Sequence, residues 1–182
     1  MGSNVDAAML VELLRILRER GADRIEHSET SLYEHLTGVF SILDRWGVAA
    51  DVALAGLFHS AYGTESFGVA LFDLSDRSQL AGVIGAPAER LVFLFSTVAR
   101  GTLSGVLLGV MPDPLDARTG AAVPLDEQTL IDLMVLSLAN TREMSQRDPM
   151  AGGITDLERQ VAYGIRHRLP EAALRWIDEA LA

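Results

Sequence analysis

Three of the four histidines in this chain, His27, His35 and His59, lie in its first third. Imidazole is the commonest metal ligand in proteins and the usual general base near neutral pH. His35 lies level with Leu32 and Val39 on one apolar stripe, and His59 ends the apolar run that follows. A lone histidine on an apolar face is more often a hydrogen-bonded core residue. Three histidines on neighbouring elements favour a shared functional site.

Polar residues beside these histidines complete the predicted site. We predict His35, His59 and Tyr62 as catalytic residues, and Ser60, Thr64, Glu65 and Asn140 as ligand-binding residues. Glu143 and Glu65 are further candidates for an acid or for a partner of a ligating histidine. The alternative is structural: residues 60–65 are a helix end that Gly63 terminates, and Ser60 and Asn140 satisfy one another's polar groups.

The chemistry of the site has two open forms. In the first form, three neutral imidazoles from His27, His35 and His59 hold one divalent ion (zinc, manganese or iron), and the metal lowers the pKa of a bound water. In the second form no metal binds, and one imidazole whose pKa is altered by burial acts as acid or base on a small-molecule ligand. The cofactor is therefore unknown from the sequence, with one divalent metal as the candidate.

The elements that must position these residues are helices. Apolar residues recur with helical periodicity in most segments. The predicted helices span 5–20, 31–47, 49–63, 76–85, 86–100, 126–146, 154–170 and 171–182. We expect a loop over 64–75, and N-caps at Ser28 or Thr30 and at Asp126. Glycines and prolines in 101–125 predict a small β-hairpin near 102–125, with strands near 103–110 and 121–125.

Length and composition predict a single domain over residues 1–182. The chain has 182 residues, 49% of them hydrophobic, and no cysteine, which excludes disulfides and thiolate sites. A net charge of −10 disfavours nucleic acid as a partner. No apolar run is long enough for a membrane span and no signal peptide is visible, so we expect a cytoplasmic protein. Apolar residues in the helices of 154–182 are compatible with a homodimer or with burial within one chain.

Several motifs resemble the HD superfamily. The pattern H-L-x-x-V-x-x-I-L, followed by W-G and by V-A-L-A-G-L-F-H-S, is similar to the first half of an HD domain, and this chain carries it in residues 35–60. The segments EHLTGVFSILDRWG, AGLFHSAYGTESF and LMVLSLANTREM are most similar to a family of small HD-like bacterial proteins of uncharacterised function. The resemblance covers about residues 21–145 and implies an all-α, HD-like helical bundle.

The resemblance also implies a metal-dependent phosphohydrolase site, in which His35 matches the first histidine and His59 matches the histidine of the His-Asp pair. However, Ser60 stands in place of the paired aspartate, and Asn140 lies nearest to the later one. A two-metal site needs a bridging carboxylate, so these neutral residues disfavour it. The spacing of the motifs also resembles that of the alarmone hydrolases, in which an acidic pair serves hydrolysis. Gly63 and Thr64 stand at the corresponding positions, and neither can transfer a proton.

Two functions remain open. We expect either a small-molecule enzyme with hydrolytic or acid–base chemistry and at most one histidine-bound metal, or a non-catalytic ligand-binding or regulatory protein on a degenerate HD scaffold. The retained histidines favour the first function, and the loss of both aspartates favours the second.

Overall fold

The computed structural model describes residues 5–27, 30–64, 67–147 and 153–179, and within them the chain is mainly helical. The all-α prediction is therefore confirmed. The helices are α1 (Ala7–Glu19), α2 (Leu32–Trp46), α3 (Ala50–Phe58), α4 (Arg77–Ile84), α5 (Ala86–Thr97), α6 (Arg100–Leu107), α7 (Glu127–Arg147), α8 (Asp156–Gly164) and α9 (Glu171–Glu179). Short 3-10 turns occupy Ala22–Arg24 and Arg166–Arg168, and one small sheet pairs β1 (Glu26–His27) with β2 (Thr30–Ser31).

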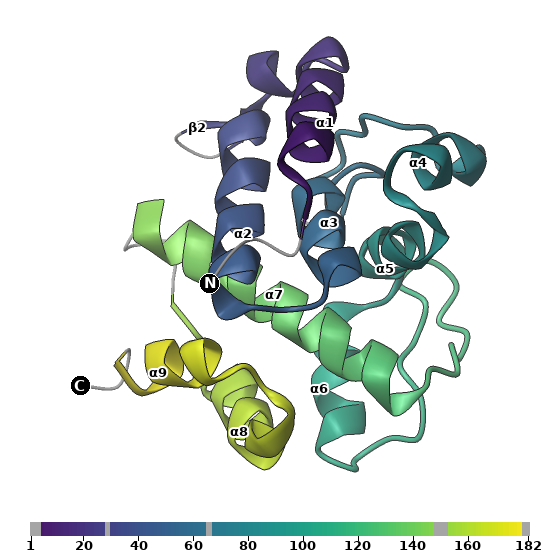
Figure 1. The fold of residues 1–182 in the computed structure, drawn as a ribbon. Coiled ribbons are helices and arrows are strands. Elements are labelled where there is room, and N and C mark those ends of the chain that lie inside the picture. Colours follow the sequence, from purple (N-terminus) through teal and green to yellow (C-terminus); the bar gives the residue numbers. More distant parts are fainter. Residues whose placement is uncertain (1–4, 28–29, 65–66, 148–152, 180–182) are drawn as a thin grey trace.

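The longest of these helices, α7, runs across the bundle and contacts α2, α3 and α5 (Figure 1). Helices α4 and α5 pack beside α3, while α6 and α8 contact one another on the other side of α7. Helix α9 contacts α2, where the rings of Trp46 and Trp176 lie 6.1 Å apart. Because α7 crosses the other helices, its side chains can meet residues from the N-terminal end of α2 and the C-terminal end of α3.

Helices α2 and α3 form a closely packed hairpin. Ser31 caps α2 by accepting a hydrogen bond from the Glu34 amide, and the Glu34 carboxylate accepts one from the Ser31 amide. Gly47 ends α2 with a φ of 71°, a conformation that favours glycine. Gly56 lets α3 approach α2, because a Cβ atom there would overlap Leu43. The predicted N-cap at Thr30 is wrong, since Thr30 lies in β2; Ser28 lies outside the described residues.

The predicted strand near 103–110 is wrong, because Arg100–Leu107 forms helix α6. Leu103 and Ser104 are buried on one face of this helix, and contacts with α7 and α8 outweigh the low helix propensity of its glycines and valine. The second predicted strand is reduced to a single antiparallel bridge between Leu115 and Ala122. The small hairpin of this fold instead lies at 26–31, where His27 pairs with Thr30.

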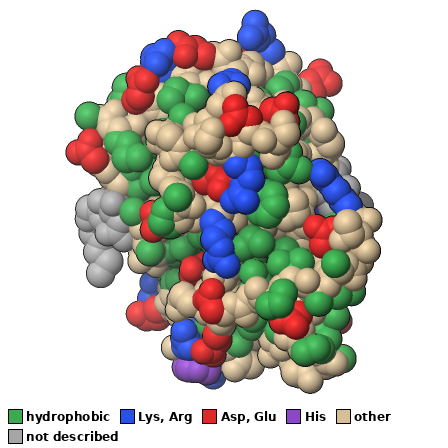
Figure 2. Space-filling view, turned by 90° about the vertical axis from the view of Figure 1, so that its right-hand side faces the viewer, with side chains coloured by type: hydrophobic (Ala, Val, Ile, Leu, Met, Phe, Trp, Pro, Cys, Tyr) green, Lys and Arg blue, Asp and Glu red, His purple; other side chains and the backbone are tan. Residues whose placement is uncertain are grey.

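The C-terminal helices bury much of their apolar surface within the chain. Val161 and Ile177 are almost completely buried, and Ile165 is 9% exposed, so a homodimer is not required to cover them. Figure 2 shows acidic and basic side chains interspersed on one face of the molecule. Among the described helices, none combines the length and the apolar character that crossing a bilayer requires.

Candidate functional site

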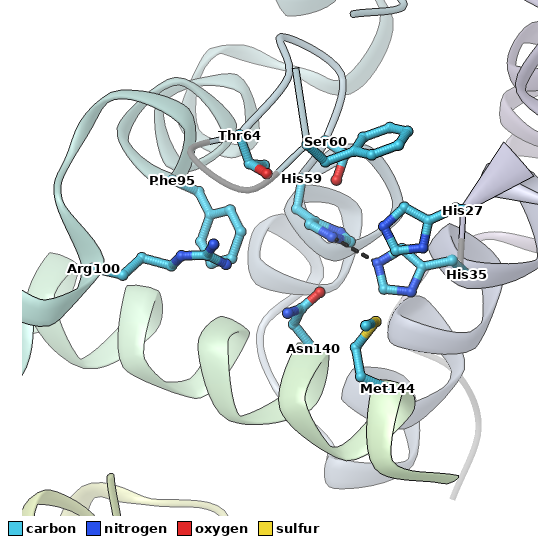
Figure 3. Close-up of a pocket in the computed structure, with 10 residues that line it drawn as sticks. His27, His35, His59, Ser60, Thr64, Phe95, Arg100, Asn140 and Met144 are labelled. Carbon is cyan, nitrogen blue, oxygen red and sulfur yellow. Dashed lines mark hydrogen bonds between the residues drawn. The ribbon is translucent and has the colours of Figure 1, made fainter. Parts of the chain in front are cut away.

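A cavity of about 170 Å³ opens where α2, α3, α5 and α7 meet (Figure 3). Six of the predicted site residues line it, so the fold brings these residues together in space. The residues that line the cavity are His27, His35, His59, Ser60, Thr64, Phe67, Phe95, Arg100, Asn140 and Met144. None of these described lining residues is acidic, but a buried negative charge lies directly behind the wall.

That negative charge comes from Glu143, which is buried on α7 behind His35. Nδ1 of His35 lies 2.5 Å from Oε2 of Glu143, and Nε2 of His35 lies 3.1 Å from Nε2 of His59. Nδ1 of His59 donates to the Gly56 carbonyl oxygen at 2.8 Å. The other Glu143 oxygen accepts a hydrogen bond from Arg147. A continuous hydrogen-bonded chain therefore runs from α7 through α2 to α3.

The hydrogen-bond partners at the two ends of this chain determine which of its ring nitrogens carry protons. Burial, followed by the charge of His35, lowers the pKa of His59 well below its ordinary value, so this ring is neutral, with its proton on Nδ1 and a lone pair on Nε2. Burial acts to raise the pKa of Glu143, but hydrogen bonds and charge from His35 and Arg147 outweigh it and leave that pKa lowered. Nε2 of His35 must then carry the proton that joins the two rings, and Glu143 balances its charge.

His27 is placed differently from the other two histidines. Its ring stacks on His35, with centroids 4.1 Å apart and planes at 15°, and it contacts Phe67 edge-on at 4.7 Å. Burial, together with the charge of His35, lowers the pKa of His27 to about 4. Its Nδ1 atom is buried and has no hydrogen-bond partner among the described residues. His27 is therefore a neutral polar group with an unused hydrogen-bonding atom in the wall of the cavity.

The three histidines, as they are arranged here, do not fit the metal-bound form of the site that the sequence left open. Ring nitrogens coordinate a metal through lone pairs in the ring plane, and two stacked rings cannot direct such lone pairs at one ion. Ser60 and Asn140 supply no carboxylate in compensation. No group of three or more His, Asp or Glu side chains in the described parts of the chain is arranged to hold a metal ion. Coordination by all three imidazoles would require His27 to leave its stack on His35.

The residues on the far wall of the cavity are an arginine and an aromatic ring. Arg100 opens α6, and its guanidinium carbon lies 5.2 Å from the centre of the Phe95 ring. Phe95 also contacts His59 edge-on, with ring centroids 5.4 Å apart. Arg100 lowers the pKa of His59 through its charge, after the larger effects of burial and of His35. Sequence reasoning missed Arg100, because one arginine among 15 basic residues carries no distinguishing pattern.

Tyr62 does not belong to the cavity, although we predicted it as catalytic. Its hydroxyl donates to Oε1 of Glu89 at 2.9 Å, and Glu89 in turn pairs with Arg77. Burial, followed by the hydrogen bond to Glu89, raises the pKa of Tyr62. The chain leaves helical geometry after Phe58 and turns at Gly63, which has a φ of 75°, and Tyr62 therefore points toward α5.

Of the remaining predicted residues, three line the cavity and one lies outside the described residues. Ser60, Thr64 and Asn140 line the cavity, and no hydrogen bond joins Ser60 to Asn140 in the described structure. Their mutual satisfaction, the structural alternative, is therefore not what holds them there. Glu65 lies outside the described residues.

Comparison with known proteins gives one match. The profile of a family described as a domain of unknown function (DUF6817) matches residues 16–100. This match includes the three clustered histidines, Ser60 and Arg100, but ends before Asn140 and Glu143 on α7. No curated protein and no solved structure matches the chain.

Proposed function

We propose that this protein is an enzyme that performs acid–base chemistry on a small polar molecule bound in the histidine cavity. The observation that carries the proposal is the buried chain Glu143–His35–His59, whose two rings form part of the cavity wall. A carboxylate that orients a histidine and balances its charge is the arrangement that general acid–base catalysts use. The resemblance to the HD superfamily, in which this end of the bundle carries the chemistry, supports the same location.

His35 is the proposed acid and base. The Glu143 carboxylate holds its Nδ1 proton, so Nε2 is the atom that exchanges a proton with the ligand. A ligand acceptor atom that enters the cavity competes with Nε2 of His59 for this proton. His59 keeps its own proton on Nδ1 through the Gly56 carbonyl and takes part as the neutral partner. Phe95 packs edge-on against the His59 ring and adds an apolar side to the site.

The proposed reaction proceeds without a metal ion. Among the described residues, the cavity surface carries no carboxylate, and three-histidine coordination would require His27 to leave its stack on His35. Proton transfer to or from the ligand, directly or through a water molecule, needs only the groups already in place.

Solvent deuterium exchange provides the test. The purified protein is incubated in D2O with a panel of small organic acids, and ¹H NMR follows the loss of C–H signals. We expect exchange in at least one compound, reduced about 10²-fold to 10⁴-fold by His35→Gln. The matched control is His167→Gln, because His167 is exposed on the 3-10 turn Arg166–Arg168. Equal exchange rates in wild type and His35→Gln would contradict the proposal.

The second candidate function is non-catalytic ligand binding. It is favoured by the neutral lining of the cavity, in which Ser60 and Asn140 stand where the HD resemblance implies aspartates. In that case, compounds from the same panel would shift amide resonances of the cavity residues without exchanging protons, and His35→Gln would change only their affinity.

A further inference from the structure

A second cavity adjoins the histidine cavity. It has a volume of about 390 Å³, lies between α6, α7 and α8, and shares Arg100, Asn140 and Met144 with the first. In Figure 3, Asn140 and Met144 rise from α7 on one side, and Arg100 extends in beside Phe95. Three shared lining residues show that the two spaces are neighbouring compartments of one site.

The sizes of the compartments constrain the ligand. Pockets for organic ligands usually measure ~300–1,000 Å³. The histidine cavity, at about 170 Å³, lies below this range, whereas the cavity between α6, α7 and α8 lies within it. The histidine cavity therefore suits a single functional group, and the rest of a ligand extends past Asn140 into the larger compartment.

Apolar atoms contribute most of the surface of the larger compartment, although many of its lining residues are polar. Leu103, Met134, Met144 and Leu157 line it, together with small and hydroxyl-bearing residues of α6 and α7. Flexible methionine side chains adapt to aliphatic ligands of varied shape. Glu158 is the acidic residue among the described lining residues, and its oxygens accept hydrogen bonds from Thr155 and Thr141. Its carboxylate is therefore committed to the cap of α8.

A cationic side chain and an amide lie at the junction between the compartments. Arg100 lines both cavities, and Asn140 lies there with an amide that can donate hydrogen bonds. An anionic group at this junction would meet the guanidinium and the amide, with the two imidazoles on the inner side. An aliphatic chain attached to it would occupy the space between α6, α7 and α8.

We infer that the ligand of this site is an elongated organic anion, with its carboxylate or other anionic head at Arg100 and Asn140 and an aliphatic body in the compartment between α6, α7 and α8. The inference rests on the proposed function only for the acid–base chemistry at the head group. Beyond that function, it identifies the chemical class of the substrate.

A series of straight-chain carboxylates tests the inference. Acetate, butyrate, hexanoate and octanoate are titrated into the wild-type protein, and ¹H–¹⁵N NMR measures the dissociation constants. We expect affinity to rise about threefold to fourfold for each added methylene until the compartment is filled. Arg100→Gln should weaken every member by a similar factor, because it alters the head-group contact alone. Affinity independent of chain length, in a protein that binds the shorter members, would overturn the inference, as would no binding of any member.

A matched pair of glycine substitutions locates the aliphatic body. Gly101 lines the larger compartment on α6, and a Cβ atom there would meet no atom within 4 Å. The same holds for Gly82 on α4, which is exposed and does not line the site. Gly101→Phe should remove the chain-length dependence beyond butyrate, and Gly82→Phe should keep it. Equal dependence in both variants would show that the chain binds elsewhere.

His35→Gln separates this inference from the proposed function. If the inference holds, the variant keeps the chain-length dependence while it loses proton exchange. If wild type binds the series as expected but catalyses no exchange of any bound acid, the catalytic proposal fails and the ligand class stands.

Discussion

The Nε2 atoms of His35 and His59 face each other at 3.1 Å, and the partners on their Nδ1 atoms determine what this contact means. A carboxylate on one side and a backbone carbonyl on the other both require Nδ1 protons. One further proton must then lie between the rings. In the proposed function, two imidazoles held in this way transfer a proton, whereas two core histidines bonded to separate carbonyls could not.

Glu143→Gln tests the role of the carboxylate behind His35. The amide keeps the shape of the side chain but removes the charge that balances the proton on His35. We expect turnover to fall about 10²-fold, with KM nearly unchanged because Glu143 does not line the cavity. Steady-state kinetics on the compound that exchanges in D2O measures both constants. A rise in KM with unchanged kcat would place Glu143 in ligand binding instead.

Tyr62→Phe separates the second polar cluster from the site. The substitution removes the hydrogen bond to Glu89, which keeps its ion pair with Arg77, so we expect a loss of about 0.5–1.5 kcal/mol in the free energy of unfolding. Activity should stay at the wild-type level. Urea denaturation and turnover measured on the same sample check both statements, and a large loss of activity with unchanged stability would return Tyr62 to the site.

Site residues that lie on or next to a recognisable apolar pattern can be predicted from the sequence. His35 lies on the apolar stripe of α2, His59 and Ser60 directly follow the apolar helix α3, and Asn140 lies on the periodic helix α7. Tyr62 could not be placed, because the direction of a side chain beyond a helix end depends on where the chain turns. Its true environment depends on Glu89, whose position in space the sequence does not reveal.

At the scale of the helices, the close contact between α2 and α7 determines where Glu143 lies relative to His35. Gly38 on α2 faces Glu143 on α7: a Cβ atom at Gly38 would lie 2.7 Å from Oε1 and 2.8 Å from Cγ of Glu143. The glycine therefore leaves room for the carboxylate to reach His35. A close approach of this kind is visible only when the two helices are placed together.

Gly38→Ala should displace Glu143 and impair the hydrogen bond to His35. Crowding costs ~1–3 kcal/mol, and the better helix propensity of alanine returns ~1 kcal/mol, so we expect a net destabilisation of about 0–2 kcal/mol. Activity should fall by much more than this loss of stability explains. Gly82→Ala is the control, because its Cβ atom meets open space and the variant should be slightly more stable. Thermal unfolding measures the stability of both variants, and steady-state kinetics measures their activity. A fully active Gly38→Ala protein would show that Glu143 needs no fixed position.

Helices with a regular apolar period were predicted close to their observed bounds, as α1 (Ala7–Glu19) and α7 (Glu127–Arg147) show. The composition of residues 103–110 predicts a strand because it disfavours a helix, but packing against α7 and α8 makes Arg100–Leu107 a helix instead. Each strand of the observed hairpin has two residues, too few for a period to be detected.

For the whole molecule, the buried imidazoles make stability depend on pH. The pKa of His27 is lowered to about 4 and that of His59 is well below its ordinary value, so the unfolded chain binds more protons than the folded one as pH falls below ~6.5. The free energy of unfolding should therefore decrease from pH 7 to pH 5, by up to ~1.4 kcal/mol per pH unit for each such proton. Urea denaturation at pH 7, 6 and 5 measures this slope. His59→Gln should flatten it, and a slope that is identical in the variant would contradict the assignment.

The protonation states of the imidazole rings test the central claim most directly. Long-range ¹H–¹⁵N NMR reports which nitrogen of each ring carries a proton. We predict that His59 stays neutral, with its proton on Nδ1, from pH 7.5 to pH 5.5, and that a strongly downfield proton shared by His35 and Glu143 disappears in Glu143→Gln. If His59 instead becomes protonated near pH 6.5, as an exposed histidine does, and no downfield proton is present, the chain Glu143–His35–His59 is not hydrogen-bonded as proposed.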